Sequence, residues 1–318
     1  MIIVTGAVGF IGSQLIKKLN DNNFKDIIAV DNFDQADKNK NIAGLSIKER
    51  IDRDVFLDWL TKNGKSVEFI FHIGAKTDTS LFDKDLLAKM NTEYTKSIWH
   101  SCIDFHIPMV YASSAATYGL GEYGYTDDES EIHKLKPLNP YGQSKQDFDM
   151  WALDQERKPF FWTGLKFFNV YGPNEYHKGR MASVIWHAYN QIKATNGMKL
   201  FRSHNPAYKD GEQMRDFVYV KDVVDVCYWL MHHRKNSGIY NLVSGTARTF
   251  LDLTQNVFKA MKVKEDISFI DTPEDIRDKY QYFTEANMDK LKSIGYKKDF
   301  HTLEEGVEDY VSNYLVQL

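Results

Sequence analysis

Tyr141 and Lys145 are the two residues whose types and spacing predict chemistry most directly. Residues four apart share one face of a helix, so a helix here would place the ammonium of Lys145 beside the phenol of Tyr141. A nearby cation favours the phenolate and lowers the pKa of the phenol from its usual value of about 10. Such a group can take a proton from an alcohol while a nicotinamide takes the hydride. The same spacing also occurs in ordinary exposed helices, so the interpretation depends on the rest of the chain.

A glycine-rich turn near the start of the chain supplies that context. Gly6, Gly9 and Gly12 follow a predicted strand and open a predicted helix. Glycine allows a tight turn and a close approach of the backbone to a pyrophosphate, which the helix N-terminus attracts. A carboxylate at the end of a second predicted strand can bind ribose hydroxyls. Glycines alone are typical of any turn, but this combination predicts a dinucleotide site that includes Gly6, Gly9, Phe10, Ile11, Gly12 and Asp31.

The choice between NAD and NADP stays open at this point. Asp31 would repel the 2′-phosphate of NADP and therefore favours NAD. Asn32 follows it, however, and Lys38 and Arg53 lie nearby in sequence, where cations could neutralise that phosphate. Lys38 could equally be a solvated loop charge. We predict NADP as the cofactor and NAD as the alternative, a preference that rests mainly on the family resemblance given below.

Two further segments are predicted to border the cofactor. Ile73, Gly74 and Ala75 end a predicted strand and form a turn of mostly small residues, which suits a position beneath the ribose on the nicotinamide side. Asn91 begins a predicted helix. It is expected either to hold the backbone of the cofactor site or to cap that helix.

A serine is expected beside Tyr141 at the reacting oxygen. Ser113 and Ser114 follow the predicted strand that should end near the nicotinamide. A hydroxyl there can hydrogen-bond the reacting oxygen, and we select Ser114, for which a turn-forming role is the alternative. Ala115 and Ala116 occupy the places where a sugar dehydratase would need acids to expel a hydroxyl. Oxidation and reduction without elimination are therefore favoured.

The composition is that of a globular protein. The chain has 318 residues, of which 43% are hydrophobic and 26% charged, and its formal net charge of −4 indicates no broad nucleic-acid surface. Cys102 and Cys227 lie in apolar stretches and are predicted to be buried thiols rather than a disulfide or a metal pair. The chain opens on a predicted strand, with no signal sequence and no long apolar run. We therefore expect a cytoplasmic protein with no membrane segment and no metal site.

Predicted strands and helices alternate through the first half of the chain. Apolar runs predict strands at 2–4, 27–30, 67–71, 109–112 and 164–168, and helices over 10–20, 53–61, 91–105 and 142–156. Such alternation is typical of a parallel sheet with right-handed crossovers. The predicted fold class is α/β, a Rossmann-type doubly wound parallel sheet with a smaller, mixed α/β substrate-binding lobe in the C-terminal half.

The pattern becomes less regular after Pro173. Helices are predicted over 182–193, 221–232, 250–261 and 303–314, and strands over 215–220 and 239–242. We predict that the NADP-binding domain comprises residues 1–168 with parts of 214–243. The substrate-binding domain is then expected to comprise 169–213 and most of 244–318.

The chain resembles the extended short-chain dehydrogenases/reductases and, more narrowly, the family of ADP-L-glycero-D-manno-heptose 6-epimerases. The glycine turn and the Tyr-x-x-x-Lys pair occur throughout the superfamily. The runs His177-Lys178-Gly179 and Met181-Ala182-Ser183 are far more specific to these epimerases. Matching runs extend nearly to the end of the chain, at 1–6, 111–119, 167–173, 215–220 and 305–307.

The resemblance implies an epimerase of lipopolysaccharide heptose precursor synthesis that acts on ADP-D-glycero-D-manno-heptose. Tightly held NADP takes hydride from carbon 6 and returns it to the other face of the ketone. The family places the two acid/base groups at Tyr141 and Lys178, and Lys145 would hold the nicotinamide ribose. Val170 and Lys178 are implied as further cofactor contacts. From the residues alone, Lys178 would be a phosphate-binding or surface lysine, and it can act as a base only with a lowered pKa.

Substrate contacts are also implied by the resemblance. Arg215 suits a diphosphate because guanidinium binds phosphate with two hydrogen bonds, although a salt bridge with Asp216 is the alternative. Tyr280 could instead be core, and His187 an interior histidine. The implied substrate residues are Asn169, Arg180, His187, Phe201, Arg215 and Tyr280.

Several departures from the family pattern concern the sugar. Arg180 stands where a serine is usual, Arg202-Ser203-His204 replaces an acid-glycine-serine turn, and a longer loop at 206–212 precedes Arg215. The nearest alternative is another nucleotide-sugar epimerase or reductase, such as a UDP-hexose 4-epimerase, which needs only the tyrosine and not Lys178. A non-catalytic NADP-binding module is a further alternative, but such modules commonly lose the Tyr-x-x-x-Lys pair. The resemblance also implies a homo-oligomer, often a pentamer.

Overall fold

The computed structural model describes residues 1–277 and 280–318. Its centre is a seven-stranded sheet in the order β10-β6-β5-β4-β1-β2-β3, and neighbouring strands are parallel throughout. The predicted Rossmann-type fold is therefore confirmed. The strands are β1 (Ile2–Thr5), β2 (Ile27–Asp31), β3 (Glu49–Asp52), β4 (Phe69–His72), β5 (Met109–Ser114), β6 (Trp162–Phe167) and β10 (Gly238–Leu242).

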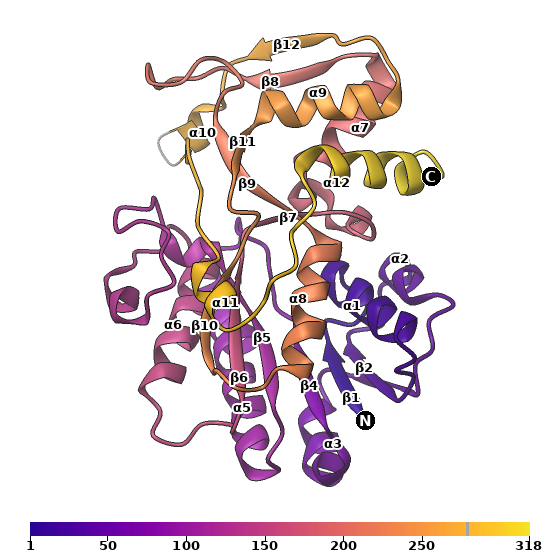
Figure 1. Ribbon diagram of the computed structural model, residues 1–318, viewed down its shortest axis with the longest axis vertical. Helices are drawn as coiled ribbons and strands as arrows, with labels where there is room; N and C mark the ends of the chain where they lie inside the picture. Colours follow the sequence, from indigo (N-terminus) through magenta and orange to yellow (C-terminus); the bar gives the residue numbers. More distant parts are fainter. Residues whose placement is uncertain (278–279) are drawn as a thin grey trace.

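Helices cover both faces of this sheet (Figure 1). On one face α1 (Phe10–Asp21) packs against α8 (Val220–His232), and on the other lie α3 (Phe56–Asn63), α5 (Tyr94–Asp104) and α6 (Pro140–Asp154). Because the sheet is covered twice, its central strands are almost wholly apolar and buried. Cys102 and Cys227 are buried free thiols, as predicted.

The smaller lobe lies beyond the carboxyl ends of the sheet strands, at the top of Figure 1. It holds a mixed sheet of β11 (Ala247–Thr249), β9 (Met214–Tyr219) and β7 (Asn169–Tyr171), and a parallel pair of β12 (Ile267–Ile270) and β8 (Met198–Phe201). Its helices are α7 (Val184–Thr195), α9 (Phe250–Met261) and α12 (Leu303–Tyr310). The chain returns to the main sheet at β10, and the proposed domain boundaries stay a prediction. The remaining short helices are α2 (Ala36–Asn39), α4 (Lys84–Leu87), α10 (Glu274–Arg277) and α11 (Asp289–Ser293).

The starts of α6 and α3 differ from the prediction for reasons that their first residues show. α6 starts at Pro140, because Asn139 caps it by accepting the N–H of Gly142 at 2.8 Å and proline suits the first helical position. α3 starts only at Phe56, because the N–H of Arg53 donates to the carbonyl of Asp31 at 3.0 Å and prolongs the strand pairing. That pairing belongs to β3, a polar edge strand with no apolar run to reveal it.

The helix that contains Asn91 also differs from the prediction. α4 continues through a π-helical turn, Ala88–Glu93, into α5, so Asn91 lies inside a continuous helix instead of opening one. Such wider turns occur frequently at functional sites because they shift the side chains that follow. Here the turn brings Asn91 against α6, as described below.

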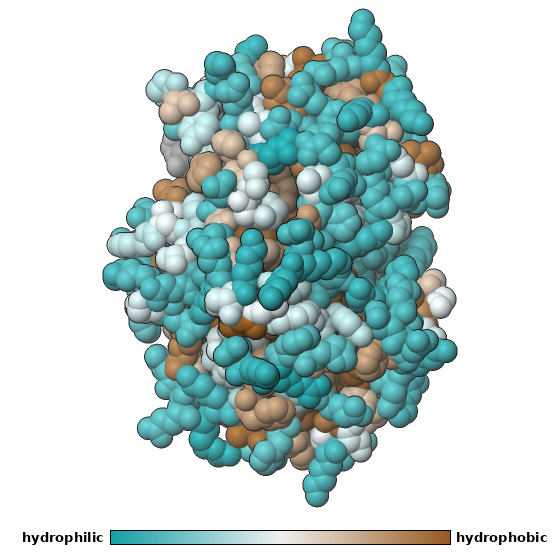
Figure 2. All heavy atoms as spheres, viewed as in Figure 1, coloured by the Kyte–Doolittle hydropathy of each residue, from teal (hydrophilic) through white to brown (hydrophobic). Residues whose placement is uncertain are grey.

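The outer surface is mostly polar. On the face shown in Figure 2, hydrophilic residues predominate and hydrophobic ones form small, separate groups. Within residues 1–277 and 280–318, no helix has both the length and the apolar character needed to cross a membrane.

Candidate active site

The glycine turn after β1 borders a cavity of about 990 Å³ that also reaches residues of the lobe. Gly6 has a φ of +66°, and a Cβ there would lie 2.7 Å from the Cα of Gly74. A Cβ at Gly12 would collide with the carbonyl oxygen of Gly6. Gly9 precedes α1 and offers no side-chain cap, so the first N–H groups of this helix remain for a ligand. A backbone cradle at a helix N-terminus fits a dinucleotide pyrophosphate.

Asp31 and two cations lie together at the end of β2. The Asp31 carboxylate accepts hydrogen bonds from the backbone N–H groups of Val8 at 3.1 Å and Asn32 at 2.8 Å. Burial raises the pKa of Asp31, and Lys38 and Arg53, which line the same cavity, act against this shift. Asn32 accepts the N–H of Asp34 with its side-chain oxygen and is not among the described residues that line the cavity, so its predicted cofactor contact stays a prediction.

The turn at 73–75 lines the cavity beside the glycine turn, as predicted. The N–H of Gly74 donates to Thr5 Oγ1 at 3.0 Å, and the same hydroxyl lies 2.8 Å from Nδ1 of His72. The second ring nitrogen of His72 contacts the hydroxyl of Thr95 at 2.9 Å. Burial, with the Lys145 ammonium nearby, lowers the pKa of His72 to about 3, so the ring is neutral. This network fixes the backbone that faces the cofactor.

Asn91 acts behind the cavity wall. Its Oδ1 accepts the N–H of Lys76 at 2.8 Å, and its Nδ2 donates to the carbonyl of Lys76 at 3.0 Å and to the hydroxyl of Ser144 at 2.9 Å. Of the two roles expected for Asn91, holding the backbone is the one observed, and capping a helix is not; its predicted cofactor contact stays a prediction. The residue ties the turn after β4 to the helix of Tyr141.

Tyr141 and Lys145 line the cavity from the first turns of α6, and only 9% and 6% of their surfaces are exposed. The Lys145 ammonium donates to the carbonyl of Ala112 at 2.8 Å, and burial lowers its pKa to about 8. Burial raises the pKa of Tyr141, with the hydroxyl of Ser114 acting in the opposite direction. The predicted lowering of the Tyr141 pKa is therefore wrong in this structure, because both groups are desolvated and the ammonium is bonded to the backbone.

Of the two serines that end β5, Ser114 borders the cavity. Its oxygen accepts the N–H of Ala116 at 3.1 Å, and its hydroxyl is hydrogen-bonded to Tyr141, which is the contact that acts against the raised pKa of that phenol. Ser113 points to the opposite face of β5 and donates to the buried carboxylate of Asp149 at 2.6 Å. The choice of Ser114 over Ser113 thus agrees with the geometry, and the expected turn contact of Ser114 is also present.

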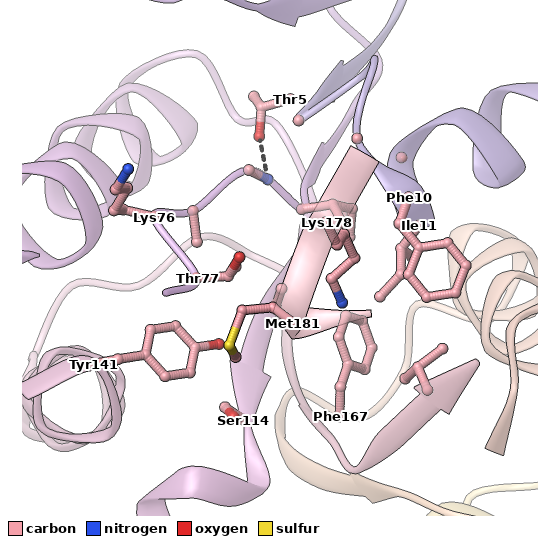
Figure 3. Close-up of a pocket in the computed structure, with 18 of the residues that line it drawn as sticks. Thr5, Phe10, Ile11, Lys76, Thr77, Ser114, Tyr141, Phe167, Lys178 and Met181 are labelled. Atoms are coloured by element: carbon pink, nitrogen blue, oxygen red, sulfur yellow. Dashed lines mark hydrogen bonds between the residues drawn. The ribbon is translucent and has the colours of Figure 1, made fainter. Parts of the chain in front are cut away.

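Lys178 also lines the cavity, and it reaches the space between the walls from the side opposite Tyr141 (Figure 3). Its ammonium lies 5.3 Å from the centre of the Phe10 ring. Burial lowers the pKa of Lys178, and the carboxylate of Glu175 opposes this shift. In Figure 3 the hydroxyl of Tyr141 and the ammonium of Lys178 point into the same space from different elements, and the side chain of Met181 reaches into it. Two titratable groups therefore approach one space from different directions.

The cavity has an excess of positive charge. Asn169 and Val170 also line the cavity, and Asn169 is exposed. Carboxylates line the cavity at Asp31 and Asp54. Cationic side chains are more numerous, which favours ligands with several phosphates. They are Lys38, Arg53, Lys76, Lys89, Lys145 and Lys178.

Arg215 lies among aromatic rings and backbone carbonyls, and its predicted contact with a diphosphate stays a prediction. Its guanidinium lies between the rings of Phe250 and Tyr280, with its carbon 5.6 Å from each ring centre, and donates to two backbone carbonyls. Of these three residues only Phe250 lines the cavity, so the ring of Phe250 separates Arg215 from the cavity. The alternative, a salt bridge with Asp216, is not formed, because the carboxylate of Asp216 accepts hydrogen bonds from the N–H and hydroxyl of Ser244.

Unlike Asn169, four other predicted substrate residues of the lobe lie outside the cavity lining: Arg180, His187, Phe201 and Tyr280. Phe201 packs edge-to-face on Tyr280, with 6.4 Å between ring centres, and Tyr280 is half-buried rather than core. His187 is exposed on α7, so the alternative of an interior histidine is wrong. Arg180 is exposed as well. Side-chain packing within the lobe, rather than the sequence motif, sets these positions.

Some lining residues were not predicted. Lys76 and Thr77 directly follow the turn at 73–75, so the register of that strand could have revealed them. Phe217 and Phe250 come from β9 and α9, whose approach to the cavity depends on long-range packing that has no local signal.

Fold and site together define a nicotinamide-dependent enzyme of the Rossmann type. Residues 2–242 match the NAD dependent epimerase/dehydratase family, and the chain belongs to that family. The Rossmann cradle and the family agree on a nicotinamide dinucleotide as cofactor.

Comparison with similar proteins narrows the group of enzymes that this chain resembles. The chain is 50% identical over 327 aligned residues to the ADP-L-glycero-D-manno-heptose-6-epimerase of Fusobacterium nucleatum, covering 100% of this chain and 98% of that one. It is 46% identical to the enzyme of the same name from Nitratidesulfovibrio vulgaris, with 99% and 98% covered. The solved structure of the Helicobacter pylori enzyme of that name matches with a TM-score of 0.83 at 27% identity, covering 98% and 95%. The resemblance predicted from the motifs is confirmed.

A UDP-N-acetylglucosamine 4-epimerase from Methanobrevibacter ruminantium has a TM-score of 0.85 at only 22% identity, with 100% and 98% of the two chains covered. At that identity the likeness concerns the fold alone. One scaffold carries several sugar chemistries, so the reaction has to be argued from the site.

Proposed function

We propose that this protein is an NADP-dependent epimerase that inverts carbon 6 of ADP-D-glycero-D-manno-heptose, giving ADP-L-glycero-D-manno-heptose for lipopolysaccharide core synthesis. The observation that carries this proposal is the approach of Tyr141 and Lys178 to one space from different walls of the cavity. Inversion at a carbinol carbon needs proton transfer in two opposite substrate orientations, and one such group per orientation suits it. The names of the full-length relatives support ADP-heptose as the substrate.

A nicotinamide bound in the cavity would accept the hydride of carbon 6 with both bonding electrons and return it to the other face of the ketone. In the oxidative half-reaction one of the two groups, Tyr141 or Lys178, would take the hydroxyl proton. In the reductive half-reaction the second group would protonate the ketone oxygen. The lowered pKa of Lys178 suits it to take the first proton, and the raised pKa of Tyr141 suits it to give the second. The Ser114 hydroxyl would hydrogen-bond the reacting oxygen.

Two features favour this reaction over the alternatives. A UDP-hexose 4-epimerase needs only the tyrosine, and would have no use for the half-buried Lys178 in the cavity. A non-catalytic binding module would not require the buried pair of Tyr141 and Lys145.

Cofactor choice and assembly are two further parts of the proposal. Lys38 and Arg53 line the cavity close enough to Asp31 to affect its pKa, so they can neutralise a 2′-phosphate on the same ribose. This placement supports NADP over NAD. The family resemblance supports a homo-oligomer, often a pentamer, and analytical ultracentrifugation would test it.

The decisive experiment is turnover of defined sugars. Purified protein is incubated in D2O with ADP-D-glycero-D-manno-heptose, and in parallel with UDP-glucose and UDP-N-acetylglucosamine, and products are followed by proton NMR. Only the heptose should epimerise, and its carbon 6 should keep protium because the hydride returns directly. Unchanged heptose in the presence of bound cofactor would refute the proposal, and deuterium at carbon 6 would replace hydride transfer with proton abstraction.

A further inference from the structure

A buried carboxylate closes the segment 172–183, which carries Lys178. Glu175 has 0% of its surface exposed. Its Oε1 accepts the Ser183 hydroxyl at 2.6 Å and, at 3.4 Å, the N–H of Gly172. Its Oε2 accepts the N–H of Ser183 at 2.5 Å. One side chain thus joins the two ends of the segment, and Ser183 in turn caps α7 by accepting the N–H of Trp186.

The same segment is tied to the cofactor half of the molecule. The N–H of Lys178 donates to the carbonyl of Glu175 at 2.9 Å. The side-chain amide of Asn41 donates to the carbonyls of Asn174 at 3.1 Å and Val8 at 3.0 Å. Val8 belongs to the glycine turn, so the loop of Lys178 and the cofactor cradle share a support.

Glu175 and Lys178 affect each other electrostatically. Burial raises the pKa of Glu175, and the hydrogen bonds from Ser183 and the charge of Lys178 act against this shift. Burial raises the pKa of the neighbouring Tyr310 and Tyr176 hydroxyls, and the Glu175 charge adds to this effect, so both phenols stay neutral. Burial, with the charges of Lys38 and Lys178, lowers the pKa of the His177 imidazole to about 4, so it is neutral as well. Glu175 therefore supplies the negative charge of this group.

We propose that Glu175 is a positioning residue for Lys178: its carboxylate holds the ends of segment 172–183 together and provides a negative charge within the loop that carries the Lys178 amine. Buried acids cost free energy unless they are hydrogen-bonded, and this one is bonded to the loop it closes. The acid/base role of Lys178 to which this inference refers rests on the proposed function. The clamp and the charge can be separated by substitution.

The charge is tested by titrating the Lys178 amine directly. Lysines are dimethylated with 13C-formaldehyde, and the signal of Lys178, assigned by its loss in Lys178→Arg, is followed by NMR against pH. Glu175→Gln keeps the shape but removes the charge, so the midpoint should fall by about one pH unit, the size expected for a lost neighbouring charge. The control is Glu156→Gln, an exposed acid after α6 with the same change in net charge. An unchanged or higher midpoint in Glu175→Gln would overturn the charge role.

The clamp is tested with Glu175→Asp, which keeps the charge but withdraws the carboxylate from Ser183 by one methylene. Its kcat should fall about tenfold or more with little change in KM, since misplacement of an acid/base group affects the chemical step. The amine should titrate close to the wild-type midpoint. Wild-type kcat in Glu175→Asp would overturn the positioning role, and this test stands even if Glu175→Gln does not fold.

Failure of the inference and failure of the proposed function remain distinguishable. The titration needs neither substrate nor turnover, so it can succeed even if the heptose is not epimerised. Conversely, the wild-type protein could epimerise the heptose while Glu175→Gln leaves the titration midpoint of Lys178 unchanged. That result would support the proposed function and remove only the charge role of Glu175.

Discussion

The two walls of the cavity are built from different kinds of contact. On the cofactor wall the backbone dominates: Gly6 and Gly74 pack without side chains between them, and hydroxyl and amide groups lock the turns from behind. On the lobe wall side chains dominate, with Arg215 held between Phe250 and Tyr280. Backbone contacts suit a dinucleotide, which every enzyme of this kind shares, whereas side-chain contacts can be exchanged to suit a sugar. The difference predicts which property each substitution should change.

The largest effects are expected where each wall contributes an acid/base group. Tyr141→Phe and Lys178→Met should each lower kcat by about 10²- to 10⁴-fold, since each removes a proton-transfer group while keeping most of the packing. Initial rates by NMR, with thermal unfolding to confirm the fold, would measure this. Matched controls are Tyr123→Phe and Lys62→Met, both exposed. Normal turnover in Lys178→Met would show that the lobe wall supplies no chemistry.

A smaller effect is expected for Arg215, and it should distinguish this half-buried arginine from the exposed Arg180 of the same lobe. Arg215→Ala removes the guanidinium donor from the carbonyls of Met214 and Gln281 and the contacts with two rings, so we expect the free energy of unfolding to fall by about 1–3 kcal/mol. If Arg215 also attracts the diphosphate through the wall, KM should rise roughly tenfold, the effect of about 1.4 kcal/mol. Urea unfolding and initial rates distinguish these two effects.

Arg180→Ala is the control, since Arg180 is exposed and outside the cavity lining. It should change neither quantity appreciably. A larger KM effect for Arg180 than for Arg215 would mean that the lobe wall rearranges around the substrate.

Sequence reasoning succeeded where short spacing determines position. Gly6, Gly12 and Asp31 follow adjacent strands, so the parallel fold itself brings them together. The helix pair of Tyr141 and Lys145 also reaches the cavity, but its electrostatics could not be predicted, because desolvation and the carbonyl of Ala112 depend on the packed structure.

Long-range packing explains most of what was missed. The strand β3 is polar and lies at the sheet edge, so hydrophobicity gives no sign of it. Arg215 has partners far apart in sequence, among them the carbonyl of Gln281, and no local pattern indicates them. The buried carboxylates of Asp149 and Glu175 also lacked a signal, since an acid in a sequence is more often exposed than buried.

The cofactor wall is built mainly from backbone contacts, but at its ribose end charged side chains are expected to contact the cofactor. Lys38→Ala and Arg53→Ala should each weaken NADP binding about tenfold while changing NAD affinity little, since a charge-assisted contact to the 2′-phosphate contributes on the order of 1.5 kcal/mol or more. Titration calorimetry on protein stripped of cofactor measures both dissociation constants. Lys40→Ala is the control, because Lys40 is exposed and paired with Asp37 at 2.7 Å. Equal losses of affinity for NAD and NADP would show that these cations do not bind the 2′-phosphate.

The smallest expected effect concerns His72, which locks the cofactor wall from behind. Its pKa of about 3 in the folded protein lies below its ordinary value of 6.5, so between these values the unfolded chain binds a proton that the folded chain does not. Stability from this group is therefore complete above pH 6.5 and declines as the pH falls toward 3. Between pH 7.5 and 5.5 it should account for a loss of about 1.4 kcal/mol in the free energy of unfolding. Urea unfolding at both pH values should show that loss reduced in His72→Gln but retained in His100→Gln, a change at an exposed histidine. Other titrating groups act equally in all three proteins and cancel from the difference, so an unchanged pH dependence in His72→Gln would mean that the ring already carries a proton in the folded state.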